Sequence, residues 1–240
     1  TTFKVSEMAK KLNFPLKCVG IPKTVDNDLP YTDCSPGFGS VAKYIATSTL
    51  EAGLDVKSMA ETSTKVFILE VMGRHAGWIA AASCLAATKA GDPPHIILLP
   101  EVPFDKTKFI TQVKQTVKEK GYCVIVASEG TQTKNGKFLA DSGLTDAFGH
   151  KQLGGVAPIL AGMISKIGLK NHWAVADYLQ RSARHIASKT DLDQAYAVGE
   201  HAVRLAIAGK TAVMPIIKRI SHSPYKWKIE TAPLKNVANI

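Results

Sequence analysis

The sequence predicts an α/β protein with two Rossmann-like parallel-sheet layers, flanking helices and a cleft between the layers. Short apolar runs rich in β-branched residues alternate with segments of helical periodicity, which is typical of parallel sheets. Of the 240 residues, 45% are hydrophobic and 21% are charged, as expected of a globular protein with a large core. No internal repeat or low-complexity linker interrupts this alternation.

Apolar residues that recur every three or four positions predict the helices. Glycines after three of these segments, at positions 53, 91 and 209, are interpreted as helix ends. The predicted helices cover residues 4–13, 38–53, 78–89, 106–120, 155–167 and 191–208.

Short runs of β-branched and apolar residues predict the strands. They cover residues 16–21, 66–71, 95–100, 122–128, 172–178, 212–219 and 225–231. Asn135-Gly136 predicts a type I′ hairpin turn. In open α/β sheets, ligands bind beyond the carboxyl ends of the strands, so the loops that follow these strands are the places to look for a site.

The charge balance indicates which classes of ligand the protein binds. Thirty Lys and Arg residues against 20 Asp and Glu give a net charge of +10, which favours phosphates, nucleotides or nucleic acid. The alternative is that an acidic part of a longer chain is missing.

No stretch without Lys, Arg, Asp and Glu exceeds 14 residues, which is too short for a transmembrane helix. The four cysteines lie far apart without zinc-ligand spacing, which favours a reduced, cytoplasmic protein.

The loop at residues 22–28 has the highest density of reactive groups. Lys23 and Thr24 can meet phosphate oxygens. Asp26 and Asp28, two positions apart, can face one cavity, where one carboxylate would take a proton and the other would help to hold Mg²⁺. The alternative is a solvated turn, because Asp, Asn and Pro are common in turns.

Three further loops follow predicted strands. In residues 72–77, the glycines permit close backbone approach, and Arg74 can reinforce an anion site, unless this is only a helix start with a surface arginine. Glu129 can accept sugar hydroxyls or cap the next element. Tyr178 and Arg181 lie on one helical face, where they hold a second phosphate or simply stack.

Three patterns are rejected as sites. The G-x-G-x-x-A sequence at residues 37–42 follows a polar loop rather than a strand, so it is interpreted as a helix start. Gly209-Lys210-Thr211 lacks the earlier glycine of a P-loop. Basic and aromatic residues alternate at residues 218–228 as in a nucleic-acid-binding strip, but a basic hairpin edge explains them better.

Together these loops resemble the phosphofructokinase family, and the version found here is most similar to its pyrophosphate-dependent branch. That resemblance implies reversible phosphoryl transfer between pyrophosphate and the 1-hydroxyl of fructose 6-phosphate, giving fructose 1,6-bisphosphate. The matching segments are Gly20-Ile21-Pro22-Lys23-Thr24-Val25-Asp26-Asn27-Asp28, Glu70-Val71-Met72-Gly73-Arg74-His75-Ala76-Gly77, Ser128-Glu129-Gly130 and Asp177-Tyr178-Leu179-Gln180-Arg181.

The resemblance also implies individual roles. Asp26, Lys23 and Arg74 would be catalytic, with Asp26 accepting the hydroxyl proton and Lys23 stabilising the transferring group. Asp28 would support a Mg²⁺ ion whose main ligand is expected upstream of Thr1. The implied substrate-binding residues are Thr24, Val25, Asp26, Met72, Gly73, Arg74, Glu129, Tyr178, Leu179, Gln180 and Arg181.

The family pattern further implies an organisation and an assembly. Residues 1–37 would belong to an N-terminal phosphoryl-donor domain, 38–177 to the fructose 6-phosphate-binding domain, and 178–240 to chain returning to the first domain. The sequence would be an internal fragment lacking both ends, including the family's Gly-Gly-Asp loop. We expect a cytoplasmic homodimer or homotetramer without nucleic-acid or membrane partners, in which Lys65 and His172 align with arginines of a neighbouring subunit.

Other functions remain open at this point. Some ATP-using relatives also carry Pro-Lys-Thr, so an ATP-dependent 6-phosphofructokinase is the alternative enzyme. A non-catalytic phosphosugar-binding protein on the same fold and a nucleic-acid-binding protein are the alternatives from other classes. The presence of Asp26 favours an enzyme, because binding alone does not require a base.

Overall fold

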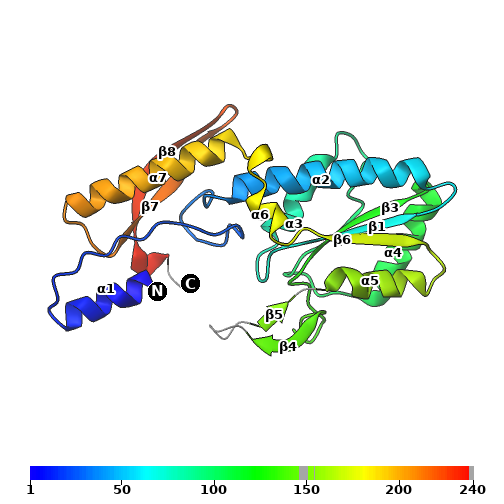
Figure 1. Cartoon of the computed structure of the whole chain (residues 1–240), viewed down its shortest axis with the longest axis horizontal. Coiled ribbons are helices and arrows are strands. Elements are labelled where there is room, and N and C mark those ends of the chain that lie inside the picture. Colours follow the sequence, from blue (N-terminus) through cyan, green and yellow to red (C-terminus); the bar gives the residue numbers. More distant parts are fainter. Residues whose placement is uncertain (146–150, 154, 238–240) are drawn as a thin grey trace. The chain divides into compact units, whose positions relative to one another are not determined.

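The chain divides into two compact units in the computed structural model (Figure 1), which describes residues 1–145, 151–153 and 155–237. Unit 1 comprises Thr1–Ser40 and Ala187–Ile240, and unit 2 comprises Val41–Ile186. The predicted α/β class with a parallel sheet is confirmed. The division into residues 1–37, 38–177 and 178–240, and the cleft, stay predictions.

Unit 2 is built on a four-stranded parallel sheet in the order β2-β3-β1-β6. Its register places Val71 beside Ser128 and Glu70 beside Val175, so β1, β3 and β6 end at the same edge. The loops after these three strands are therefore neighbours, which positions the candidate site. The strands are β1 (Val66–Val71), β2 (Ile96–Leu98), β3 (Cys123–Ser128) and β6 (Asn171–Val175).

Helices cover both faces of this sheet because strand side chains alternate between the faces. On one face, α4 (Lys106–Lys120) and α5 (Val156–Ser165) pack against Ile68 and Ile125. On the other face, α2 (Phe38–Met59) contributes Val56, which packs with Val124. Figure 1 shows α2 and α5 on opposite sides of the sheet.

The remaining elements of unit 2 are short. They are α3 (Trp78–Ala82), η1 (Ser83–Ala86), the antiparallel pair β4 (Asp141–Thr145) and β5 (Lys151–Leu153), α6 (Leu179–Ser182) and η2 (Arg184–Ile186). The β4–β5 pair is absent from the sequence-based expectation.

Unit 1 contains the hairpin that the sequence predicts around residues 218–228, and its two strands are antiparallel, unlike the parallel sheets that the alternation of strands and helices favours. Strands β7 and β8 are joined by only Ser223 and Pro224, and so short a connection allows antiparallel pairing only. The segment predicted as a strand at residues 16–21 forms a single parallel bridge, from Val19 to Val213. The elements are α1 (Thr2–Lys11), α7 (Lys189–Ile207), β7 (Val213–His222), β8 (Tyr225–Pro233) and η3 (Leu234–Asn236).

Besides the strand at residues 16–21, three local predictions are wrong. Helix α2 runs through Gly53, where a Cβ would lie 2.7 Å from the Pro93 ring, so the glycine serves packing. The predicted helix at 78–89 ends early, because the Asp92 carboxylate accepts the N–H groups of Thr88 and Lys89 in a loop. The turn at Asn135 is not type I′, because only Gly136 there has a positive φ.

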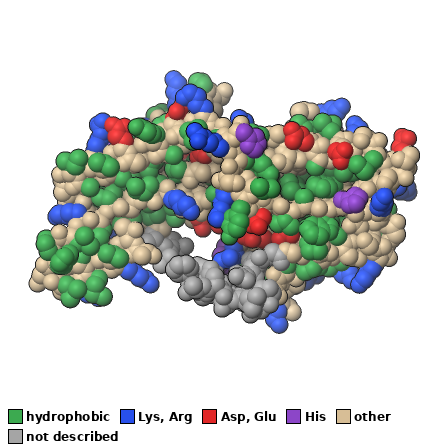
Figure 2. Space-filling model, in the orientation of Figure 1, with side chains coloured by type: hydrophobic (Ala, Val, Ile, Leu, Met, Phe, Trp, Pro, Cys, Tyr) green, Lys and Arg blue, Asp and Glu red, His purple; other side chains and the backbone are tan. Residues whose placement is uncertain are grey.

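Both signs of charge are present on the described part of the face that Figure 2 shows. On the visible, described face of Figure 2, Lys and Arg side chains are scattered among hydrophobic and acidic ones. Hydrophobic side chains gather over α1, where Met8 and Leu12 are exposed. None of the helices in the described part of the chain combines the length and apolar character that a bilayer crossing demands.

Candidate active site

In unit 2, the loop after β1 interlocks with the loop after β3. The Gly73 N–H donates to Oε1 of Glu129 at 3.4 Å, and the Ser128 hydroxyl donates to the Gly73 carbonyl. A Cβ at Gly130 would lie 2.1 Å from the Arg74 carbonyl oxygen and 2.5 Å from that of Gly73. Position 130 therefore admits only glycine while the two loops keep this contact.

The same β1 loop is held on its other side by the segment after β6. Gln180 is 2% exposed. Its Oε1 accepts the Met72 N–H at 3.3 Å, and its Nε2 donates to the Asp177 carbonyl at 2.9 Å. The amide of this predicted substrate ligand is thus engaged with backbone, and it ties Met72 to the start of α6.

The cationic side chains of unit 2 differ in their surroundings. Nε of Arg74 is buried and has no hydrogen-bond partner within the described residues. Arg181, in contrast, lies on the surface with its guanidinium 4.2 Å from the centre of the exposed Tyr178 ring. Arg181 thus stacks on Tyr178, which is one of the two arrangements that the sequence predicts. Leu179, the next residue after Tyr178, is also exposed. Arg74 retains a buried donor that suits an anion.

The loop of unit 1 folds back on a buried serine. Ser35 is fully buried; its hydroxyl accepts the Thr24 N–H at 3.1 Å, and its N–H donates to Oδ1 of Asn27 at 2.8 Å. The Asp26 N–H in turn donates to the Thr24 hydroxyl at 3.1 Å. Among the predicted site residues, Lys23 and Asp28 are exposed, and Thr24, Val25 and Asp26 are half-buried.

A carboxylate from α7 fixes the end of this loop. Asp191 is 5% exposed and accepts the N–H groups of Gly37 at 2.8 Å and Ser40 at 3.1 Å. It thereby caps the N-terminus of α2, where a negative charge is favourable. Sequence reasoning missed Asp191, because 151 or more residues separate it from the groups that it caps.

The described residues do not form a complete metal site. No group of three or more His, Cys, Asp or Glu side chains in this part of the chain is placed to hold a metal ion. Asp28 offers one exposed carboxylate, whereas Mg²⁺ prefers six oxygen ligands. Asp28 alone therefore supplies at most a minor part of a magnesium site.

The two units carry different chemistry. The interlocked loops of unit 2 present backbone N–H groups, a buried guanidinium donor and the Glu129 carboxylate, which suit a polar ligand with an anionic group. The unit 1 loop presents the Lys23 ammonium and the Asp26 carboxylate, the groups that a proton and phosphoryl transfer needs. The roles of the individual residues stay predictions.

Two relatives with known names show what the chain is similar to. The chain is 66% identical over 240 residues to pyrophosphate–fructose 6-phosphate 1-phosphotransferase of Halomonas elongata, covering 100% of this chain and 57% of that protein. It is 32% identical over 221 residues to ATP-dependent 6-phosphofructokinase 3 of Streptomyces coelicolor, covering 90% and 60%. The chain thus spans little more than half the length of these relatives.

A solved structure and a family profile also match phosphofructokinases. The crystal structure of pyrophosphate-dependent phosphofructokinase from Marinobacter aquaeolei matches with a TM-score of 0.87 and 60% identity, covering 99% of this chain and 56% of that one. The profile of the family described as Phosphofructokinase matches residues 2–206. Because that match covers most of the chain, the protein belongs to the phosphofructokinase family.

Proposed function

We propose that this chain belongs to an enzyme that transfers a phosphoryl group from pyrophosphate to the 1-hydroxyl of fructose 6-phosphate, giving fructose 1,6-bisphosphate. The observation that carries the proposal is the Met72–Arg74 loop, held between Glu129 and Gln180 with the Arg74 Nε donor unpaired among the described residues. The name of the 66% identical relative supports the same substrate pair.

In this proposal the loop of unit 1 supplies the reacting groups. The Asp26 carboxylate accepts the proton of the sugar 1-hydroxyl. At the same time, the oxygen of that hydroxyl forms a bond to a phosphorus atom of pyrophosphate. The bond from that phosphorus to the bridging oxygen breaks, and phosphate leaves. The Lys23 ammonium stabilises the charge on the transferring group, because phosphoryl transfer depends mainly on positioning and electrostatic stabilisation.

The loops of unit 2 bind the sugar phosphate. Arg74 and Arg181 provide positive charge for the phosphate group, and the Tyr178 hydroxyl donates a hydrogen bond to it. The Glu129 carboxylate accepts hydrogen bonds from the sugar hydroxyls. The backbone around Met72 and Gly73, together with Thr24, Val25 and Leu179, completes the proposed binding set. A divalent metal, Mg²⁺ in our proposal, would neutralise phosphate charge, with Asp28 as a minor contributor.

The test compares phosphoryl donors. The full-length protein is supplied with fructose 6-phosphate and Mg²⁺, with pyrophosphate in one reaction and ATP in another. Formation of fructose 1,6-bisphosphate with pyrophosphate alone is the expected result. Formation with ATP alone supports the second candidate, an ATP-dependent 6-phosphofructokinase, which the 32% identical relative favours. Binding of fructose 6-phosphate without turnover in either reaction indicates a non-catalytic binding protein.

The remaining expectations are part of the same proposal. We propose a cytoplasmic homodimer or homotetramer that does not bind nucleic acid or membranes. Light scattering on the purified full-length protein measures the oligomeric state. Affinity for nucleic acid that falls steeply with salt would contradict the absence of a nucleic-acid partner.

A further inference from the structure

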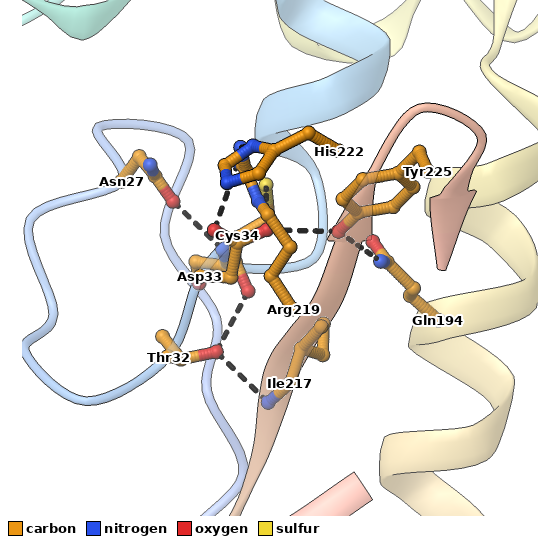
Figure 3. A network of polar contacts seen from close by, with 10 residues as sticks. Asn27, Thr32, Asp33, Cys34, Gln194, Ile217, Arg219, His222 and Tyr225 are labelled. Atoms are coloured by element: carbon orange, nitrogen blue, oxygen red, sulfur yellow. Dashed lines mark hydrogen bonds and ion pairs between the residues drawn. The ribbon is translucent and has the colours of Figure 1, made fainter. Parts of the chain in front are cut away.

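Asp33 lies at the centre of a polar network in unit 1 (Figure 3). Its Oδ1 pairs with an Nη atom of Arg219 at 2.9 Å, and its Oδ2 accepts the Tyr225 hydroxyl at 2.9 Å. The Asp33 side chain is 18% exposed and that of Arg219 39%. The ion pair is therefore partly shielded from water and also hydrogen-bonded, unlike a fully exposed surface pair.

A second layer of contacts orients these partners. Gln194, 3% exposed on α7, donates from Nε2 to the Tyr225 hydroxyl oxygen at 3.0 Å. The hydroxyl proton of Tyr225 is thereby directed to Asp33. Arg219 also donates to Nδ1 of His222 at 3.0 Å, so its guanidinium is held on two sides (Figure 3).

The network continues into the backbone of the loop. The Asp33 N–H donates to the Ile217 carbonyl at 2.8 Å, and the Ile217 N–H donates to the Thr32 hydroxyl at 3.1 Å. Two residues after Asp33 comes Ser35, whose contacts with Thr24 and Asn27 were described above. A short chain of bonds thus runs from strand β7 through residues 33–35 to the loop that carries Asp26.

The Cys34 thiol does not add a second negative charge beside Asp33. Burial raises the pKa of the Cys34 thiol to about 11. The thiol is therefore protonated at neutral pH, and Asp33 is the negatively charged partner of Arg219 among the residues drawn in Figure 3.

We propose that Arg219 and Tyr225 are positioning residues, which hold the loop at residues 23–28 through Asp33 in the geometry needed for phosphoryl transfer. Two of the hairpin residues that alternate basic and aromatic character, Arg219 and Tyr225, thus act on a loop of the same unit rather than on a nucleic acid. The effect on catalysis rests on the proposed function, whereas the effect on the loop does not.

The test uses two variants and one matched control in the full-length protein. Tyr225→Phe removes one hydroxyl without changing the shape of the ring, and Arg219→Met removes the charge. Lys228→Met is the control, because Lys228 is exposed on the same hairpin and its ion pair is with Glu230 instead of Asp33. Amide hydrogen exchange of residues 24–35 and steady-state kinetics with pyrophosphate and fructose 6-phosphate are measured for each.

We expect exchange in residues 24–35 to rise about tenfold in Arg219→Met and less in Tyr225→Phe, with residues 72–77 unchanged. We expect kcat to fall about tenfold in Arg219→Met, with KM for fructose 6-phosphate within about twofold of wild type. Lys228→Met should match wild type in both. Unchanged loop exchange, or an unchanged kcat in an active enzyme, would overturn the proposal. An inactive wild-type protein with the expected exchange pattern would instead refute the proposed function and keep the loop assignment.

Discussion

The two sets of candidate site residues are held in place by different means. In unit 2, the loops follow strands of one parallel sheet, and close backbone packing at Gly130 and a single buried amide join them. In unit 1, the reactive loop depends on side chains from α7 and the β7–β8 hairpin, 151 or more residues away in the chain. The proposed binding loops are thus fixed by the sheet itself, and the proposed reactive loop by a remote part of the sequence.

The largest effect should come from the proposed base. Asp26→Asn removes the proton acceptor and keeps the size of the side chain, so kcat should fall by about a hundredfold or more. KM for fructose 6-phosphate should change little, because the loops of unit 2 are untouched. Steady-state kinetics check this, with the exposed Asp193→Asn as the control. Activity that survives in Asp26→Asn would show that reaction and binding are not divided between the loops as proposed.

A side chain at position 130 should break the interlock of unit 2. In Gly130→Ala, the Cβ would clash with two carbonyl oxygens, and we expect a loss of about 3 kcal/mol in the free energy of unfolding. Urea denaturation measures it. Gly162→Ala is the control, because nothing lies near a Cβ at this position in α5, and there alanine should stabilise by about 0.5–1 kcal/mol. Equal stability of the two variants would contradict the proposed packing.

Loss of the Gln180 amide should affect one substrate selectively. Gln180→Met leaves the Met72 N–H and the Asp177 carbonyl without their partner, at a cost of about 1–3 kcal/mol for a buried group. We expect KM for fructose 6-phosphate to rise about tenfold, with KM for pyrophosphate unchanged. Gln115→Met, on the exposed face of α4, is the control. A parallel rise in both KM values would show that the two regions are not independent.

The smallest effect concerns the ionisation of Tyr225. Burial, reinforced by the hydrogen bond to Asp33, raises the pKa of Tyr225 to about 12, although the bond from Gln194 works in the opposite direction. Cys34, Arg219 and His222 are further titratable groups of this network. Because the folded state favours the protonated phenol, this contribution to stability is fully present below about pH 10 and is lost as the pH rises towards 12.

An ultraviolet titration of wild type minus Tyr225→Phe isolates this group. The difference signal should have its midpoint near pH 12. A midpoint near pH 10 would mean that the phenol is not held against Asp33 and that the loop of unit 1 is anchored less firmly than described.

Much of unit 2 could be predicted because its signals are local. Residues 66–71 and 106–120 were expected as a strand and a helix and are found with those bounds, since β-branched runs and apolar periodicity are properties of neighbouring residues. The rule that ligands lie beyond strand ends also located the loops at Met72 and Glu129. Their interlock could not be predicted, because it depends on the register of two strands.

The supports of the unit 1 loop left no comparable trace in the sequence. In the sequence, Asp33, Asp191 and Gln194 are ordinary polar residues of a loop and a helix, and nothing in their spacing identifies partners so far away. Arg219 and Tyr225 were noticed only for their alternation of charge and aromatic character. Side-chain hydrogen bonds between distant segments arise from tertiary packing, which periodicity does not encode.

The contact around Gly130 has a consequence for redesigning the proposed binding loops. Since the carbonyls of Gly73 and Arg74 leave no room for a Cβ at position 130, and the Met72 N–H is bonded to Gln180, exchanging one of these loops alone would disturb the other two. The three segments should therefore be varied together. They are residues 72–77, 128–131 and 177–181. A directed-evolution library that varies them jointly should yield folded variants far more often than libraries that randomise each segment alone.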